Sequence, residues 1–345
     1  MFHLLEVKEV KRETADTVSI AFNVPSNIES DFNFKAGQYL TLKRDINGED
    51  VRRAYSLCSS PVESEYRVAV KLVENGLFST YANNELKAGD KLEVMAPMGN
   101  FCIETNTSNS KNYLLVAAGS GITPMLSIVK TVLAQEPSSK ISLVYGNKTA
   151  DSTIFKSEID AISNGNLKVH YVYSQQEGGA AKGRINESIC DAIVGPEMSS
   201  FNSVHVCGPE EMINSVSEYA ANKGVAKENI HFELFTVPTA SAEDKPMVEG
   251  AVNSKVTVIV DGDEIEFELH TDGDTILDAA QVEGADVPFA CKGGVCCTCR
   301  CKVEKGKAVM DANYALGEDE VEQGFILACQ AHPVTEEIVV DFDVI

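Results

Sequence analysis

Five of the ten cysteines of this 345-residue chain crowd into residues 291–301. Cys291, Cys296 and Cys299 follow the spacing C-x4-C-x2-C, and Cys329 comes after 29 intervening residues. Plant-type 2Fe-2S clusters are held by four cysteine thiolates with this asymmetric spacing and a distant fourth ligand. Zinc sites do not need such a spacing, so the pattern favours a 2Fe-2S cluster over zinc.

The residues between these cysteines support the same interpretation. Gly293 and Gly294 permit the tight curvature that three ligands around one small core require, and their N–H groups are available to cluster sulfurs. Cys297 and Cys301 fall outside the ligand spacing, and we expect them to pack as small apolar side chains rather than to act as alternative ligands. The same packing role is expected for Cys58, Cys102 and Cys190.

A second pattern, Gly119 to Pro124 (GSGITP), follows the apolar run Tyr113 to Ala118. Glycines let the backbone approach a pyrophosphate, Pro124 suits the first position of a helix, and a helix N-terminus offers N–H groups to anionic oxygens. The strand–turn–helix context therefore predicts a nucleotide site, with a plain tight connection as the alternative.

Two short segments have the residue types that a flavin needs. Arg53, Tyr55 and Ser56 of RAYS offer a cation for phosphates, a flat ring partner and a hydrogen-bond donor. Gly76 to Ser79 (GLFS) begins an expected helix and offers further N–H groups to a pyrophosphate. Taken alone, the first segment is more typical of an ordinary strand, and Ser79 is a common helix cap.

The elements that position these motifs predict three domains. Residues 1–104 contain short strands with turn residues between them, typical of an antiparallel barrel. Residues 105–236 alternate strand-like and helical segments, typical of a parallel sheet covered by helices. Residues 237–254 lack periodicity and indicate a linker. Expected barrel strands are 17–24, 38–43, 67–73 and 91–95, and the expected strands and helix of the second domain are 113–118, 124–135 (helix), 141–145, 169–173, 204–207 and 230–234.

Residues 255–345 contain the cysteine loop and the clearest turn of the chain. Val256, Val258 and Val260 alternate with polar residues, Asp261-Gly262 predicts a tight turn, and the alternation returns through residues 265–269. A helix at 275–282 and a closing strand at 338–342 flank the cysteines. Together with the cluster ligands, these elements predict a small 2Fe-2S domain.

Charge and hydropathy exclude some partners. The net charge is −23, and residues 255–345 contain 20 acidic and 6 basic side chains. Such a surface repels phosphate backbones and anionic lipid headgroups, so we expect no nucleic-acid and no membrane partner; a solvated surface and a docking face for a basic partner both explain it. No apolar run of 18 residues and no signal peptide is found, which predicts a cytoplasmic protein.

Together the motifs resemble the ferredoxin–NADP reductase superfamily fused to a C-terminal ferredoxin, over nearly the whole chain. Residues 53–56, 76–79 and 119–124 match its flavin, flavin-phosphate and pyridine-nucleotide motifs. Residues 207–212 (CGPEEM) resemble its nicotinamide-pocket segment, and residues 231–235 (HFELF) the segment that closes that domain near the flavin. With CKGGVCCTCRCKV and MDANYAL in the ferredoxin part, the chain is most similar to the reductases of phenylacetyl-CoA epoxidases, whose di-iron oxygenase opens aerobic phenylacetate degradation.

The resemblance implies a β-grasp fold for the ferredoxin domain and electron transfer from NADPH through FAD and 2Fe-2S to a di-iron oxygenase component. FMN and NADH are the alternatives for the flavin and the nucleotide. Catalytic roles are implied for Tyr55, Ser56, Cys207 and Glu233. Cofactor contacts are implied for Arg53, Tyr55, Ser56, Gly76, Ser79, Gly119, Gly121, Thr123, Pro124, Ser174, Lys182, Arg184, Gly208, Pro209 and Phe235, and cluster ligation for Cys291, Cys296, Cys299 and Cys329.

One departure concerns the nucleotide. Many NADPH-using relatives have an Arg after the serine that ends the third strand of this domain, but Ser174 is followed by Gln175 and Gln176. Lys182 and Arg184 lie nearby, and a cation on the 2′-phosphate is what separates NADP from NAD. We therefore expect NADPH.

Two other functions remain open. One is the reductase of another di-iron monooxygenase or of a ring-hydroxylating dioxygenase. The other is a non-enzymatic iron–sulfur redox sensor that retains an inactive reductase fold. Turnover separates the enzyme from the sensor, because a sensor would not oxidise NADPH with cytochrome c or ferricyanide as acceptor. The intact flavin, nucleotide and cluster motifs favour the enzyme.

Overall fold

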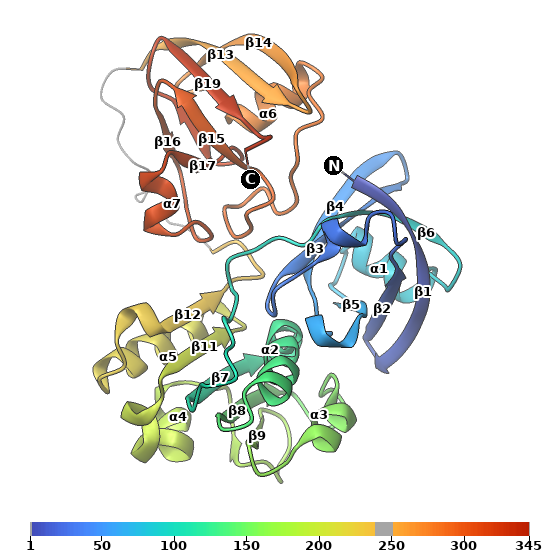
Figure 1. Cartoon of the computed structure of the whole chain (residues 1–345), viewed down its shortest axis with the longest axis vertical. Coiled ribbons are helices and arrows are strands. Elements are labelled where there is room, and N and C mark those ends of the chain that lie inside the picture. The colour runs from blue at the N-terminus through green and yellow to red at the C-terminus, as the bar shows by residue number, and fades with distance from the viewer. Residues whose placement is uncertain (1, 239–250, 345) are drawn as a thin grey trace.

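The computed structural model describes residues 2–238 and 251–344 and contains three main sheets, each at the centre of one body of the molecule (Figure 1). The strands of these sheets lie within residues 2–95, 112–233 and 253–341. Most of the expected linker, residues 239–250, lies outside the described residues. The domain boundaries themselves stay a prediction, but each sheet has the type expected for its part of the chain.

The first sheet is an antiparallel barrel with the strand order β4-β3-β6-β1-β2-β5. A bridge between Leu57 and Val68, and a hydrogen bond of 2.8 Å from the Cys58 N–H to the Arg67 carbonyl, join its two edge strands and close it. The elements are β1 (Phe2–Thr14), β2 (Thr17–Asn23), η1 (Glu29–Phe32), β3 (Tyr39–Ile46), β4 (Glu49–Ser56), η2 (Pro61–Glu63), β5 (Tyr66–Lys71), α1 (Leu77–Asn84) and β6 (Lys91–Met95).

Four of these strands agree with the sequence prediction apart from their end residues. Strand β1, which the sequence analysis did not identify, buries only Leu5, Val7 and Thr14 among its residues. The apolar alternation that identifies a half-buried strand is therefore confined to a short part of it.

The second sheet is parallel, with the order β10-β9-β8-β7-β11-β12 and helices between its strands, as expected (Figure 1). The elements are β7 (Asn112–Ala118), η3 (Gly119–Gly121), α2 (Ile122–Gln135), β8 (Lys140–Asn147), α3 (Lys156–Ile162), β9 (Leu167–Tyr173), β10 (Ala181–Lys182), α4 (Glu187–Val194), η4 (Gly195–Ser200), β11 (Ser203–Cys207), α5 (Glu210–Asn222), η5 (Lys227–Asn229) and β12 (Ile230–Glu233).

The order of this sheet reverses between β7 and β11, and ligands of open parallel sheets bind at the carboxyl ends of the strands at such a switch point. The glycine turn follows β7 there, and Gly208 follows β11. One detail of the prediction is wrong: α2 begins at Ile122, so Pro124 is its third residue and not its first. The missing N–H of Pro124 is tolerated because the first four N–H groups of a helix have no partner within it.

The third sheet has the order β14-β13-β19-β15-β17, in which β13 and β19 are parallel and the other pairs antiparallel. Asp261 and Gly262 have positive φ angles of 51° and 80°, as the predicted tight turn requires. The elements are β13 (Asn253–Val260), β14 (Asp263–His270), α6 (Ile276–Val282), β15 (Arg300–Lys305), β16 (Ala308–Met310), α7 (Glu318–Glu322), β17 (Phe325–Leu327), β18 (Ala331–Pro333) and β19 (Glu337–Asp341).

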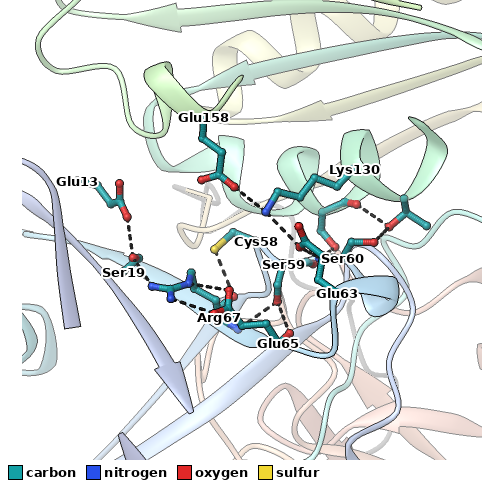
Figure 2. Close-up of polar contacts among 12 residues, drawn as sticks. Glu13, Ser19, Cys58, Ser59, Ser60, Glu63, Glu65, Arg67, Lys130 and Glu158 are labelled. Carbon is teal, nitrogen blue, oxygen red and sulfur yellow. Dashed lines mark hydrogen bonds and ion pairs between the residues drawn. The ribbon is translucent and has the colours of Figure 1, made fainter. Parts of the chain in front are cut away.

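The barrel and the parallel domain are joined by a shared core and by a polar contact region. Ala36, Cys58 and Phe101 from the N-terminal part pack into the same buried cluster as α2. Figure 2 shows Lys130 of α2 between Glu63 of the barrel, at 3.1 Å, and Glu158 of α3, at 2.6 Å. These contacts fix the two domains to each other on both an apolar and a charged surface.

The same contact region contains hydroxyl and thiol groups of the loop after β4 (Figure 2). The Ser60 hydroxyl lies 2.8 Å from that of Thr131, and the Ser127 hydroxyl donates to the Ser59 carbonyl at 2.6 Å. Cys58 is buried and its thiol donates to the Arg67 carbonyl, which agrees with the packing role expected for it. Desolvation by burial raises the pKa of this thiol, so it stays protonated.

Candidate redox site

The cysteine loop connects α6 to β15, and the fourth cysteine follows β17, the edge strand next to β15. Strands β15 and β17 pair through Arg300 and Leu327, which brings the turn after β17, with Cys329, to the loop. Cys296, Cys299 and Cys329 are buried, and Cys291 is half-buried. The fold therefore assembles all four predicted ligands at one place.

The four thiols contact one another. The Cys296 thiol lies 3.1 Å from the Cys291 sulfur. Hydrogen bonds from Cys296 and Cys329 lower the pKa of Cys291, and contact with Cys291 raises the pKa of both donors. Cys329 also contacts Cys299, so the four form one connected set. One thiol of the set is thus already stabilised as the thiolate that metal ligation requires.

Within residues 2–238 and 251–344, no group of three or more His, Cys, Asp or Glu side chains is arranged to hold a single metal ion. The four cysteines likewise do not surround a position for a single ion; the sulfurs of Cys291 and Cys296, for example, are in direct contact. Their donor chemistry carries the assignment: a set of four thiols with no carboxylate or imidazole among them suits an iron–sulfur cluster.

The backbone of the loop has the curvature expected of it. Gly294 has a φ of +73° and Lys292 one of +50°, both in the left-handed region. The Gly293 N–H donates to the Cys291 sulfur at 3.4 Å, the kind of contact proposed to tune a cluster. A Cβ at Gly293 would lie 2.0 Å from Cγ2 of Val237, so this position has no room for a side chain.

The other two cysteines of the loop region have packing environments. Cys301 is fully buried in the apolar core of the third sheet. The Cys297 thiol donates to the Ala315 carbonyl at 3.4 Å and accepts from the Asn100 amide at 3.7 Å. Burial raises the pKa of both thiols. Cys102 and Cys190 also have raised pKa values because of burial, which agrees with their expected packing role.

The two flavin segments lie together in the barrel. Residues 53–56 form the end of β4, and Gly76 precedes α1. The Tyr55 ring lies 5.5 Å from the Phe78 ring, which joins the two segments. Arg53 is exposed and donates to the Arg52 carbonyl. The Ser79 hydroxyl accepts from the Val73 N–H at 3.1 Å, so it orders the loop before α1.

Three of the predicted catalytic residues meet where the barrel touches the parallel sheet. The Ser56 hydroxyl donates to the Glu233 carboxyl at 3.2 Å. Cys207 and Glu233 are neighbours in the pairing of β11 with β12. Desolvation raises the pKa of Glu233 to about 8, and the pKa of the fully buried Cys207 thiol is raised by burial and by the nearby carboxyl. Both shifts favour the neutral form of these groups.

The nucleotide motif is closely packed at the switch point. Gly119 has a φ of +55°, and a Cβ at Gly121 would lie 2.1 Å from the Cys207 carbonyl oxygen. The Thr123 hydroxyl donates to the Ser120 carbonyl at 3.0 Å, and Pro209 precedes α5. The structure thus brings the turn after β7 and the segment after β11 together, as the motifs require.

The residues expected near a 2′-phosphate lie in or directly after β9 and β10 of the same sheet. Ser174 follows β9, and its N–H donates to the Asn147 carbonyl at 2.9 Å. The Lys182 ammonium is paired with Glu177 at 2.5 Å. Arg184 is exposed, and no ion pair of its guanidinium is found in the described part of the chain.

Phe235, the residue expected near the flavin, follows β12 and is 41% exposed.

A cavity of about 230 Å³ lies where all three domains meet. Tyr39 comes from the barrel, Glu233 from the parallel sheet and Cys296 from the cluster loop. His231 and Phe232 of β12 and Tyr314 of the third domain also line it. A flavin-motif neighbour, a half-buried carboxyl and a predicted cluster ligand therefore line one cavity.

The sequence analysis missed the residues that hold the third domain on the barrel. Arg52 pairs with Asp286 at 2.7 Å, and Asn100 donates to the Ala315 carbonyl at 3.2 Å. Tyr39 contacts the cluster loop through its hydroxyl. No local spacing marks these residues, because each finds its partner in another domain.

The chain matches three family models in order. These are an oxidoreductase FAD-binding domain over residues 4–103, an oxidoreductase NAD-binding domain over residues 115–218 and a 2Fe-2S iron–sulfur cluster binding domain over residues 258–334. It is 40% identical to a component of the 1,2-phenylacetyl-CoA epoxidase of Escherichia coli (strain K12), over 99% of this chain and 98% of that protein. The chain belongs to the family of flavin and 2Fe-2S reductases that serve oxygenases.

Other relatives agree with this family. The ferredoxin reductase component of the 3-ketosteroid-9-alpha-monooxygenase of Rhodococcus rhodochrous is 33% identical over 98% of this chain and 96% of its own length. Among solved structures, phthalate dioxygenase reductase aligns over 99% of this chain and 98% of its own, with a TM-score of 0.59 and 24% identity, which shows the fold. The reductase thus uses FAD, a 2Fe-2S cluster and NAD(P)H, and it transfers electrons to an oxygenase component.

In the described part of this reductase, no helix is long and apolar enough to cross a membrane.

The ligand assignment predicts different results for two buried cysteines of one loop region. Replacing Cys299 by Ser should leave flavin reduction by NAD(P)H intact and lower cytochrome c reduction by at least about tenfold, because a cluster ligand is lost. Cys301→Ala removes a thiol of the neighbouring core and should keep both the visible spectrum of the cluster and the cytochrome c rate. Undiminished cytochrome c reduction by the Cys299 variant would refute the proposed electron order.

The raised pKa of Glu233 predicts a pH-dependent stability. Between its ordinary pKa of 4.5 and about 8, the folded protein holds a proton on Glu233 that the unfolded chain has lost. The contribution of Glu233 to the free energy of unfolding is therefore complete below the ordinary value and is lost as the pH rises through the folded value, by less than about 1.4 kcal/mol per pH unit.

Glu233→Gln removes this titration, so the variant should gain stability relative to wild type between about pH 5 and about pH 8. Urea unfolding of the flavin-free protein at the two pH values measures the gain. Glu211→Gln, on the exposed side of α5, is the matched control and should show none. A difference between Glu233→Gln and wild type that stays constant with pH would be inconsistent with a protonated Glu233.

Proposed function

We propose that this chain is the reductase of a phenylacetyl-CoA epoxidase and that it passes electrons from NADPH through FAD and 2Fe-2S to a di-iron oxygenase component. The full-length 40% identity to the E. coli epoxidase component is the observation that carries the proposal. The 3-ketosteroid-9-alpha-monooxygenase relative is less similar, at 33%. The reductase of another di-iron monooxygenase or of a ring-hydroxylating dioxygenase is the alternative.

When bound, FAD accepts two electrons together and releases them singly, and the cluster accepts one at a time. The residues of the chain hold and orient these groups. Arg53, Tyr55 and Ser56 would contact the flavin, and Gly76 and Ser79 its phosphates. The cluster would be held by Cys291, Cys296, Cys299 and Cys329.

The nucleotide would bind at the switch point of the parallel sheet. The turn from Gly119 through Gly121, Thr123 and Pro124, with Gly208 and Pro209, would hold its pyrophosphate at two adjacent strand ends. Cys207 and Glu233 would line the nicotinamide face, and Phe235 would lie near the flavin.

Ser56 and Glu233 have a second role in this proposal. The Ser56 hydroxyl donates to Oε2 of Glu233, and a carboxyl with a pKa of about 8 carries a proton at pH 7. A neutral Glu233 avoids placing an unpaired negative charge beside a site that receives a hydride.

Reconstitution tests the function. The purified chain, mixed with the di-iron oxygenase component of a phenylacetyl-CoA epoxidase, should oxidise NADPH in an oxygen-dependent reaction that phenylacetyl-CoA stimulates. The Cys299→Ser chain should fail in the same assay. Active cytochrome c reduction without any stimulation by phenylacetyl-CoA would assign the chain to another oxygenase.

NADPH preference is predicted to depend on Arg184. Lys182 is already paired with Glu177, which leaves the Arg184 guanidinium to bind the 2′-phosphate together with Ser174. Arg184→Gln should lower kcat/KM for NADPH by roughly tenfold and leave that for NADH unchanged, because one charge-assisted contact is lost. Lys182→Gln should have the smaller effect. A wild-type preference for NADH, or an equal loss with both nucleotides, would overturn the assignment.

A further inference from the structure

We propose that Tyr39 is a positioning residue for electron transfer from the flavin to the cluster. Its hydroxyl fixes the cluster loop, residues 291–299, on the strand pair that carries the flavin segment. This inference rests on the proposed roles of residues 53–56 and of the four cysteines. One electron passes from the flavin to the cluster in this step, and Tyr39 itself is neither oxidised nor reduced.

The contact is a chain of buried polar groups between two domains. The Tyr39 hydroxyl accepts from the Cys297 N–H at 3.1 Å and lies 3.1 Å from the Thr298 hydroxyl. Thr298 lies in turn 3.2 Å from the Thr41 hydroxyl. Tyr39 is 4% exposed, and Thr41 and Thr298 are each 1% exposed. Water is therefore excluded from a contact that joins residues 259 positions apart.

The donors and acceptors of these groups can be matched one after another. Cys297 donates its N–H to Tyr39, Tyr39 can donate its hydrogen to Thr298, and Thr298 can donate to Thr41. Cys297 directly follows the predicted ligand Cys296, so the backbone of the loop is held one residue from the cluster. Loss of the Tyr39 hydroxyl would leave a buried N–H without a partner, which is costly.

The barrel side of the contact is rigid and close to the flavin segment. Tyr39 is paired directly with Ser56, and Thr41 with Ala54, in the antiparallel pairing of β3 with β4. Side chains of directly paired residues lie on the same face of a sheet. The Tyr39 backbone also bonds twice to Met98, at 2.8 and 3.0 Å. The loop is thus positioned relative to the same face that presents Ser56.

The ring of Tyr39 is closely packed. Ala290 and Cys296 pack against it in a small buried cluster. A Cβ at Gly99 would lie 2.9 Å from the ring, so the opposite side is also occupied. The ring itself would survive replacement by Phe, which isolates the hydroxyl as the group to test.

Other contacts hold the third domain on the barrel independently of Tyr39. Arg52 pairs with Asp286 and lies 4.3 Å from the centre of the Phe289 ring, and Asn100 bonds to Glu320 at 2.6 Å. These contacts flank the Tyr39 contact but do not bond to the backbone beside a cluster ligand. Removal of the Tyr39 hydroxyl is therefore expected to loosen the loop without detaching the domain.

The test uses the holoenzyme with FAD and cluster bound. Tyr39→Phe should make amide hydrogen exchange at Cys297 about tenfold faster, which corresponds to about 1.4 kcal/mol of local protection. In anaerobic stopped-flow mixing with NADPH, flavin reduction should stay within about twofold of wild type, while the later bleaching of the cluster should slow by roughly tenfold.

Two further variants keep the test decisive. Thr298→Val removes the next hydroxyl, which also bonds to the Cys296 thiol, so exchange at Cys297 and the cluster potential are measured beside the rate. It should speed the exchange and slow the same phase, even if Tyr39→Phe folds poorly. Tyr66→Phe removes the hydroxyl of a barrel tyrosine whose ring packs against Phe32 and Phe34, and it should change neither exchange nor rate. Flavin reduction by NADPH tests the proposed function separately, since it does not require the Tyr39 contact.

Three results would overturn the inference. The first is exchange at Cys297 and cluster bleaching that both stay at wild-type values in Tyr39→Phe and Thr298→Val. The second is slower bleaching with unchanged exchange and a shifted cluster potential, which would make Tyr39 a tuning residue. The third is an equal slowing of flavin reduction and cluster bleaching, which would indicate a general structural role.

Discussion

The whole arrangement depends on one pair of residues in neighbouring strands, Tyr39 of β3 and Ser56 of β4. Ser56 bonds to Glu233 of the parallel sheet, and Tyr39 bonds to the backbone of Cys297 in the cluster loop. Directly paired residues of an antiparallel sheet share a face, so both neighbouring domains meet the barrel on one side. This common face is why three domains, each with its own sheet, enclose one cavity.

The two joints of the barrel differ in their physical character. The joint with the parallel domain includes a shared apolar core around Phe101 and α2, with the partly exposed Lys130 ion pairs beside it. The joint with the third domain combines a smaller apolar cluster around Tyr39 with hydrogen bonds and with the Arg52–Asp286 pair, whose carboxylate is 72% exposed. Hydride transfer needs closely fixed partners. The tighter joint therefore lies where a hydride would pass, and the more polar joint where single electrons would pass.

The parts of the site that the sequence revealed are those encoded in neighbouring residues. The spacing of Cys291, Cys296 and Cys299 and the glycine turn after β7 depend on local backbone geometry, so one stretch of sequence is enough to recognise them. The Asp261-Gly262 turn is predictable for the same reason, because positive φ angles restrict the residue types. The polar contact of Tyr39 with Thr298 joins residues 259 positions apart and leaves no periodic pattern in either segment. Strand β1 was missed because few of its side chains are buried. The start of α2 was placed too late because the helix begins at Ile122, two residues before Pro124.

Two motif glycines also have a purpose that the sequence could not show. The interpretation of Gly121 and Gly293 rested on the approach of a pyrophosphate and on the curvature around a cluster. In the structure, a Cβ at Gly121 would overlap the Cys207 carbonyl, and one at Gly293 would overlap the Val237 side chain. Backbone packing thus excludes a side chain at Gly121 before any cofactor is considered, whereas a side chain at Gly293 would have to displace Val237, which is 54% exposed. Because Cys207 neighbours Glu233 in the sheet and Val237 follows the same strand closely, these contacts link the nucleotide turn and the cluster loop to one short segment around β12. The spacing between the predicted redox groups therefore depends on packing around this segment as well as on the side chains that would bind them.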